Sequence, residues 1–323
     1  MYNGEVKYAF LGTIENDNSY KVYKSLFVKS EEIERRFGKD IYEMSVDELL
    51  VLLDYCSGMK RSSKYVSYSG YRLYIDWCIK NGKTKSENNL EKISVDNIDT
   101  TFKFRSNFIK DPEEFESICE DTFPLVDGEV TASNLQMEIC FRLAYYHEMS
   151  SEEISTLEKD DIDYESGILT RHSGEKIKLD EKLLNAIIDF NSRTTITLIN
   201  KKNEEIARTY TLDDNNYIIR TRMTNRNGEK TPLSVNSINR IFIKISEKYN
   251  ESDARSGYKN FTPANVNLSH IFYELYSSGE KITEGSKLVP KLENNSAAAK
   301  FKVYRSLKTQ TEAYESWIKA FYG

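Results

Sequence analysis

Apolar residues recur at helical spacing along most of the chain from residue 30 onward, whereas strict alternation is confined to a few short stretches. Ser30 and Ser45 each precede an apolar run with acidic residues in its first turn, which predicts a helix start at both serines. Residues 60–85 predict one or two further helices that pack into a core. Residues 1–30 alternate without a clear helical period, which favours an extended arm or a small strand pair.

A domain boundary is predicted at Lys110–Asp111–Pro112. Proline suits the first position of a helix, because its missing N–H would have no intrahelical partner there. At 323 residues the chain is long enough for two hydrophobic cores. We therefore expect an N-terminal arm and a helical domain over residues 1–110, followed by a second domain over residues 111–323.

Short strands are predicted within the second domain. Residues 164–180 favour a β-hairpin, and alternation recurs between residues 192 and 231. Ser234 predicts the start of an amphipathic helix, and residues 311–323 form another amphipathic pattern at the C-terminus. The expected fold class is mostly α with a small β-sheet, which makes the protein α+β.

The stretch from Phe261 to Gly279 has the clearest helix boundaries. A Thr262–Pro263 entry leads into an apolar run at helical spacing, and Gly279 provides the usual helix stop. The helix before it, which begins after Ser234, presents polar and basic residues on one side at a spacing of about one turn.

The distribution of charge is more informative than the net charge of −6. Residues 60–85 carry seven Lys or Arg against one acid, and residues 216–245 and 287–308 carry six each against one acid. Residues 111–166 carry seventeen acids against two cations. This segregation favours a basic groove with an acidic back, the alternative being chance clustering on solvated faces.

Composition excludes several classes of protein. With 39% hydrophobic and 30% charged residues and no apolar run of about eighteen residues, we expect a cytoplasmic protein without a membrane segment or a signal peptide. The four cysteines stand alone rather than in Cys-x-x-Cys pairs, so neither zinc nor disulfides are expected. The three histidines lack a metal-binding spacing, and no Gly-rich phosphate loop occurs, so no metal and no cofactor are predicted.

Basic and polar side chains of two segments are candidates for binding double-stranded DNA. The first segment lies at an expected helix N-terminus, where free N–H groups and the positive end of the helix dipole attract phosphate. The second combines Arg, Lys and Asn, which donate hydrogen bonds to phosphates or base edges. The candidates are Lys60, Arg61, Ser62, Lys64, Tyr65 and Arg72 in the first, and Arg220, Arg222, Arg226, Lys230, Asn239, Arg240 and Lys244 in the second.

The order of the elements resembles that of phage integrases and other tyrosine recombinases, over roughly residues 30–323. The resemblance rests on Glu153, Ile154, Leu157, Asp161, Ile162, Asp163, Thr262, Pro263, Val266 and Ser269. It implies a helical SAM-like core-binding domain, followed by a tyrosine-recombinase-type catalytic domain whose tail helix docks on a neighbouring subunit or on its own domain. A plain helical bundle is the alternative for the first domain.

The positions that carry the family's chemistry hold other residues in this chain. They are Ser150 at the first arginine, Glu148 at the glycine before it, Arg171 or His172 at the hairpin lysine, Ala264 and Asn267 in the Thr-Pro box, and Asn295 in the third box. Tyr304 keeps the position of the nucleophile, with Tyr314 as a rival. Because losing one such donor already costs about 10²–10³ in rate, the resemblance implies a recombinase fold whose active site is degenerate.

Three functions are compatible with these patterns. The first is a sequence-specific DNA-binding regulator, a phage or prophage repressor that maintains lysogeny by clasping an operator between its two domains. The second is a divergent but active recombinase, with Arg220, Arg222 or Arg255 as displaced clamp residues. The third is a protein-interaction module that does not bind DNA. Self-association through the C-terminal helix and control by a peptide or protein effector are further hypotheses about its partners.

Overall fold

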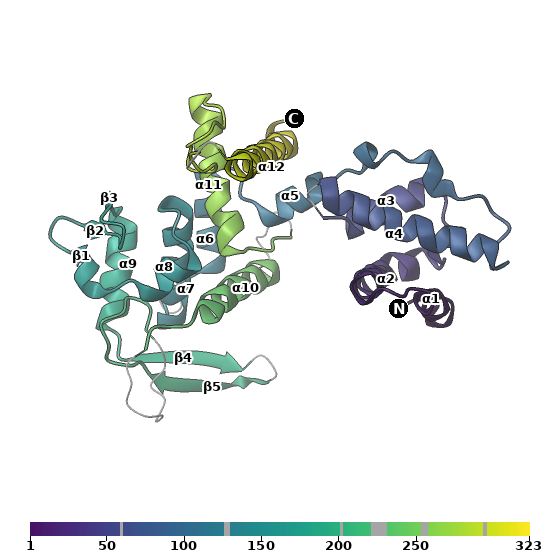
Figure 1. The fold of residues 1–323 in the computed structure, drawn as a ribbon. Helices are drawn as coiled ribbons and strands as arrows, with labels where there is room; N and C mark the ends of the chain where they lie inside the picture. Colours follow the sequence, from purple (N-terminus) through teal and green to yellow (C-terminus); the bar gives the residue numbers. More distant parts are fainter. Residues whose placement is uncertain (59–60, 126–129, 201–202, 221–230, 253–257, 293–295) are drawn as a thin grey trace. The chain divides into compact units, whose positions relative to one another are not determined.

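The computed structural model describes residues 1–323 apart from 59–60, 126–129, 201–202, 221–230, 253–257 and 293–295 (Figure 1). Contacts divide the described chain into two compact units. Unit 1 comprises Met1–Phe104 together with Ile282–Gly323, and unit 2 comprises Arg105–Lys281. The division into domains 1–110 and 111–323 remains a prediction.

Unit 1 is built from helices. They are α1 (Gly4–Leu11), α2 (Asp17–Phe37), α3 (Val46–Cys56), α4 (Arg61–Lys80) and α12 (Ala297–Tyr322), with 3-10 turns at Ile41–Glu43, Asn89–Lys92 and Val95–Asn97. Its core is rich in aromatic residues: the Tyr74 ring packs edge-on against Phe10 and Phe27, at centroid distances of 5.4 and 4.9 Å. α12 extends well beyond the predicted tail helix, and none of the described helices is long and apolar enough to cross a membrane.

Residues 1–30 are helical, so the predicted arm or strand pair is wrong. Asn16 caps α2 by accepting a hydrogen bond from the Ser19 N–H, and α2 then runs through Ser30, which was expected to be a cap. The buried face of α1 includes Lys7, whose ammonium group pairs with the buried carboxylate of Glu34. A lysine on the inner face disrupts the apolar pattern by which an amphipathic helix is recognised.

Unit 2 packs helices around one hydrophobic core and carries two small antiparallel sheets. The helices are α6 (Pro112–Thr122), α7 (Ala132–Tyr146), α8 (Ser151–Thr156), α9 (Glu181–Ser192), α10 (Val235–Glu251) and α11 (Pro263–Ser278), with a 3-10 turn at Lys159–Asp161. α5 (Thr101–Asn107) lies where the chain passes from unit 1 to unit 2. The mostly helical α+β class is confirmed.

The sheets of unit 2 are both short. β1 (Ile162–Asp163), β2 (Ile168–Thr170) and β3 (Lys176–Lys178) form one sheet in that order, with Leu169 opposite Ile177. β4 (Thr195–Asn200) pairs with β5 (Asn203–Thr211) as a separate hairpin (Figure 1). β1–β3 contain the hairpin that was predicted over residues 164–180.

Helix boundaries were predicted well where a cap is encoded locally. Ser45 and Ser234 cap α3 and α10, and Pro112 occupies the first turn of α6. Thr262 caps α11 by accepting the Asn265 N–H, and Gly279 ends that helix with a φ of 72°. A left-handed φ of this kind favours glycine, because glycine has no Cβ to clash with the backbone.

Candidate nucleic-acid interface

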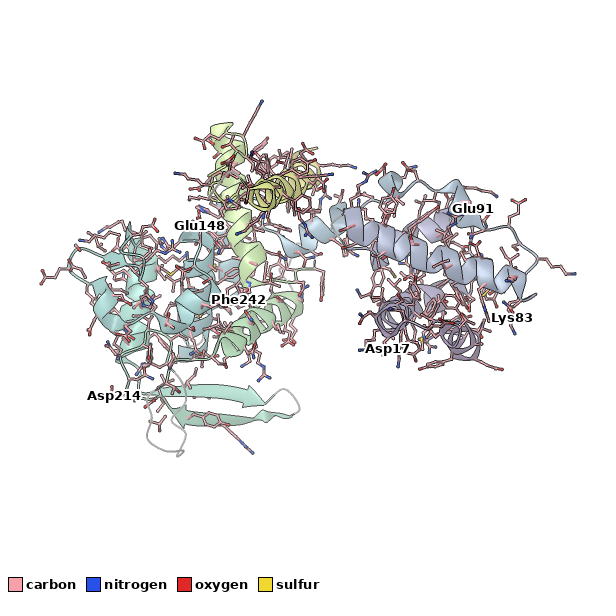
Figure 2. The ribbon with its side chains drawn as sticks, viewed as in Figure 1. Asp17, Lys83, Glu91, Glu148, Asp214 and Phe242 are labelled. Atoms are coloured by element: carbon pink, nitrogen blue, oxygen red, sulfur yellow. The ribbon has the colours of Figure 1, made fainter. Side chains whose placement is uncertain are left out.

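The turn between α7 and α8 carries the first of the aligned box positions. Ser150 caps α8: its Oγ accepts the Glu153 N–H at 3.2 Å, while the Glu153 carboxylate accepts the Ser150 N–H at 2.9 Å. Glu148, labelled in Figure 2, has a φ of 52°, a conformation uncommon for residues other than glycine. The backbone therefore has the geometry expected of the glycine with which Glu148 aligns.

The β2–β3 hairpin places a cation beside this turn. Arg171 donates hydrogen bonds to Glu153 at 2.6 and 3.0 Å and to Glu175 at 3.2 Å. Burial opposes ionisation of Glu153, but hydrogen bonds from the Ser150 backbone and from Arg171 outweigh it and lower the Glu153 pKa. His172 is 58% exposed and lies 3.8 Å from Asp161. Of the two hairpin candidates, Arg171 is the one beside the Ser150 turn.

The Thr-Pro box forms the start of α11. Ala264 is exposed in the first turn, and Asn267 is half-buried, with an Oδ1 that has no hydrogen-bond partner among the described residues. Ser269 accepts the Ile109 N–H at 3.0 Å and donates to the Asn265 carbonyl. The box therefore anchors the segment that follows α5. Neither Ala264 nor Asn267 offers a positive charge to a phosphate.

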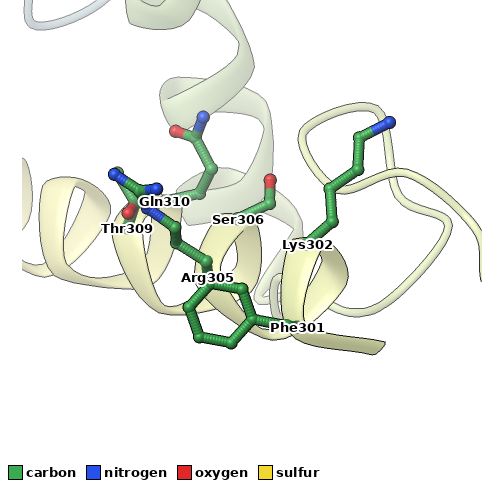
Figure 3. A pocket seen from close by; sticks show the side chains of 6 residues that line it. All are labelled: Phe301, Lys302, Arg305, Ser306, Thr309 and Gln310. Atoms are coloured by element: carbon green, nitrogen blue, oxygen red, sulfur yellow. The ribbon is translucent and has the colours of Figure 1, made fainter. Parts of the chain in front are cut away.

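The two candidate nucleophiles differ in exposure. Tyr304 is 61% exposed on α12, whereas the Tyr314 ring stacks on Trp317 at 6.2 Å. An open hollow of 370 Å³ on α12 is lined by Phe301, Lys302, Arg305, Ser306, Thr309 and Gln310 (Figure 3). Asn295, the residue aligned with the third box, lies outside the described residues.

The predicted DNA contacts of α4 are exposed except for the half-buried Lys64, but most already have partners within unit 1. Arg61 pairs with Asp96 at 3.1 Å and lies over the Tyr65 ring, and Arg72 pairs with Glu91 at 2.9 Å. Lys64 donates to the Ile98 carbonyl at 2.7 Å, and burial lowers its pKa. Exposed ion pairs are worth little, so phosphate could displace the carboxylates. Ser62 is exposed, and Lys60 lies outside the described residues.

α10 presents a basic face next to the Ser150 turn. Ser151, at the start of α8, donates a 2.8 Å hydrogen bond to the Oδ1 of Asn239. One and five residues further along α10, Arg240 and Lys244 are exposed, and neither has an ion pair or a hydrogen bond recorded with another described residue. Together these residues form a face of unit 2 that combines free cations with a helix cap.

The prediction that Arg220 contacts DNA is wrong. Its side chain is buried, its guanidinium donates to the carbonyl oxygens of Phe190 and Arg193 at 2.6 Å each, and burial lowers its pKa. Arg220 therefore holds the end of α9 and is not available to DNA. The other predicted contacts of that segment, Arg222, Arg226 and Lys230, lie outside the described residues, as does Arg255.

One group of potential ligands was missed in the sequence. Glu148, His270 and Glu274 each offer a ligand atom, and these atoms lie within 4.8 Å of one another. His270 and Glu274 are four residues apart on α11, a spacing that the sequence does reveal. Glu148 joins them only through the packing of the α7–α8 turn against α11, which no local pattern encodes.

Two family models match the chain. Residues 1–80 match the model described as the MrpR N-terminal core-binding domain, and residues 127–309 match the MrpR C-terminal catalytic domain. These matches confirm the predicted architecture of a tyrosine-recombinase-like fold with an N-terminal core-binding domain.

Similar proteins include a curated prophage protein and solved recombinases. The SPbeta prophage-derived uncharacterized protein YopR of Bacillus subtilis (strain 168) is 23% identical over 277 residues, which cover 80% of each chain. The XerA recombinase structure has 13% identity and a TM-score of 0.37, covering 98% of this chain and 92% of that one. The integrase from mycobacterium phage Brujita has 8% identity and a TM-score of 0.32, covering 99% and 92%.

Proposed function

This chain belongs to the MrpR family, and from that premise we propose that it is a sequence-specific DNA-binding repressor of prophage origin that does not cut DNA. The observation that carries the proposal is the surface beside Ser150. Arg240 and Lys244 remain exposed cations on α10, while the uncharged Ser150, Ala264 and Asn267 stand at box positions where the resemblance implies groups that hold the phosphate to be cut.

We expect no DNA cleavage, because the residues at the box positions do not supply the cations that the reaction needs. Transfer of a phosphodiester to tyrosine requires cations that stabilise the charge on the pentavalent phosphate, and arginine does this with two parallel hydrogen bonds. Ser150 caps a helix instead, and Asn267 offers only an amide. Arg171 is engaged by Glu153. An exposed Tyr304 without such neighbours is a weak nucleophile, because no adjacent group activates its hydroxyl.

DNA binding depends on a different set of residues. Arg240 and Lys244 lie one turn apart on α10 and can contact successive phosphates, while Asn239 can reach a base edge. Arg61 and Arg72 on α4 supply further cations once duplex DNA displaces their exposed carboxylate partners. Proposed DNA contacts therefore lie on α4 of unit 1 and on α10 of unit 2.

A repressor needs only occupancy of its operator, which a recombinase fold without cleavage provides. The relationship to a protein described as SPbeta prophage-derived supports a prophage origin. In that role the protein acts in the cytoplasm of the host, where the operator is. Self-association through α12 and control by a peptide or protein effector belong to the same proposal.

The alternative, an active and divergent recombinase, is favoured by two observations. Arg171 brings a guanidinium to the Ser150 turn, and Tyr304 is exposed on α12. Under this alternative Arg171 would have to leave Glu153 and take over the task of the first arginine. The two functions differ in whether a covalent bond to DNA forms.

Genomic footprinting of the intact protein should identify a small set of operators. On a duplex that contains one of them, the logarithm of the binding constant should fall linearly with the logarithm of the salt concentration. The expected slope is about −0.9 per phosphate contact, because each contact releases condensed counterions. An absence of enriched sites, or affinity that does not change with salt, would instead favour a protein-interaction module.

A further inference from the structure

Glu148, His270 and Glu274 form a compact cluster that the proposed DNA-binding role does not use. Their ligand atoms lie within 4.8 Å of one another, one from the α7–α8 turn and two from α11. The side chains of Glu148 and His270 are 17% and 13% exposed, whereas Glu274 is exposed, so the cluster is open to solvent on the Glu274 side. One imidazole with two carboxylates is a donor set that divalent transition metals favour.

The geometry at His270 points to an ion rather than to a direct hydrogen bond. Its Nδ1 is buried and has no hydrogen-bond partner among the described residues, although Oε1 of Glu148 lies 3.8 Å away. That separation is too long for a hydrogen bond. It is close to the roughly 3–3.5 Å that separates two ligand atoms on one ion with bonds of about 2.1 Å. The ligand atoms of all three residues lie within 4.8 Å of one another.

The surroundings hold the donors in place. The His270 ring packs edge-on against Tyr145 and Tyr146, at centroid distances of 5.0 and 5.8 Å. Glu274 follows one turn later on the same face of α11. Glu148 adopts a left-handed backbone conformation that is unfavourable for glutamate, and this conformation directs its carboxylate to His270.

We propose that Glu148, His270 and Glu274 bind one divalent transition-metal ion, with Zn²⁺ the best match to their mixed nitrogen and oxygen donors. The ion cross-links the α7–α8 turn, which carries Ser150, to α11, which carries Asn267. Its role is structural, because it stabilises the relative placement of these turns within unit 2. The proposal is independent of whether the protein is a repressor.

The test uses the full-length protein, treated with chelator and dialysed, and then titrated with Zn²⁺ or Co²⁺. Calorimetry should show one equivalent bound, Co²⁺ should give the absorption bands of a protein-bound ion, and Zn²⁺ should raise the thermal midpoint. Glu148→Gly and His270→Gln should each weaken binding by at least about tenfold, since a ligand is lost. Glu148→Gly is expected to fold, because glycine suits the positive φ.

His172→Gln provides the matched control, because it removes an exposed imidazole of the β2–β3 hairpin and should leave binding unchanged. The proposal is overturned if the wild-type protein binds no stoichiometric ion. It is also overturned if Zn²⁺ binding survives in both cluster variants, or if His270→Gln changes only the pH dependence of stability without any metal bound, which would indicate a simple ion pair.

Discussion

Replacing Arg142 with methionine should lower the free energy of unfolding by about 3 kcal/mol, the largest effect on stability that we expect from a single substitution in unit 2. Arg142 is 1% exposed and donates to both carboxylate oxygens of Glu116, at 2.7 and 2.9 Å, and to Glu138 at 2.8 Å. Methionine fills the space but leaves both carboxylates without their main partner. Denaturant unfolding followed by circular dichroism measures the effect.

The loss of unfolding free energy expected for Arg142→Met lies at the low end of the range for a broken buried ion pair. Glu116 is 33% exposed and keeps hydrogen bonds from Lys182 and Tyr146, so it does not become an isolated buried charge. Adding Glu116→Gln to the variant should recover part of the loss, because one of the unpaired charges disappears. If Arg142→Met is as stable as the wild type, this network does not hold α6 to α7.

The Arg142–Glu116 ion pair also predicts how the stability lost in Arg142→Met depends on pH. Burial raises the Glu116 pKa, but hydrogen bonds from Arg142, Lys182 and Tyr146 outweigh it and hold the pKa at about 2. A carboxyl group with a depressed pKa stabilises the fold above its unfolded pKa of about 4.3, and this stabilisation is lost as the pH falls. The difference between the wild type and Arg142→Met should therefore shrink between pH 4.3 and pH 2.

Replacing Arg240 and Lys244 together with alanine should weaken binding to the operator by about 10² at physiological salt, without unfolding the protein. Both side chains are exposed on α10, so their removal leaves no buried cavity. Each phosphate contact that disappears should also reduce the steepness of the salt dependence by about one unit. Fluorescence anisotropy over a range of salt concentrations measures both quantities.

A second double variant, Arg35→Ala with Arg36→Ala, removes the same charge from the exposed end of α2. It should reduce affinity much less, because α2 carries none of the proposed contacts. If the two double variants weaken binding equally, the effect comes from net charge, and α10 is not the interface.

Local signals in the sequence predicted much of the fold. Ser45, Ser234 and Thr262 cap their helices by accepting hydrogen bonds from the N–H groups three residues further on, so nearby residues suffice to locate those helix starts. The same holds for Gly279, whose positive φ ends α11. The strands of the β2–β3 hairpin were likewise visible as a short alternating segment.

The burial of charged residues could not be predicted from local sequence signals. Lys7, Arg142 and Arg220 all resemble surface residues in the sequence, yet each is buried and bound to partners far along the chain. Lys7 interrupts the apolar pattern of α1, so that helix was not predicted. Arg220 was wrongly predicted to contact DNA. Whether a charge is buried depends on tertiary contacts that supply its counter-charge or carbonyl groups, and no short pattern encodes these.

Glu148 combines a feature that the sequence predicted with one that it did not. The alignment of Ser150 and Glu148 came from the resemblance to the integrase family, and the positive φ of Glu148 fits the glycine of that alignment. The same residue takes part in a cluster with His270 that could not be foreseen, because the α7–α8 turn and α11 meet only in the folded chain.

The central proposal is that the protein occupies DNA without cutting it, and a suicide-substrate assay tests this most directly. An operator duplex nicked close to the expected cleavage site would be incubated with the protein and analysed on native and denaturing gels. We expect a retarded complex on the native gel and no protein–DNA adduct that survives denaturation, for the wild type and for Tyr304→Phe alike. A covalent adduct that forms with the wild type and disappears in Tyr304→Phe would contradict the proposal.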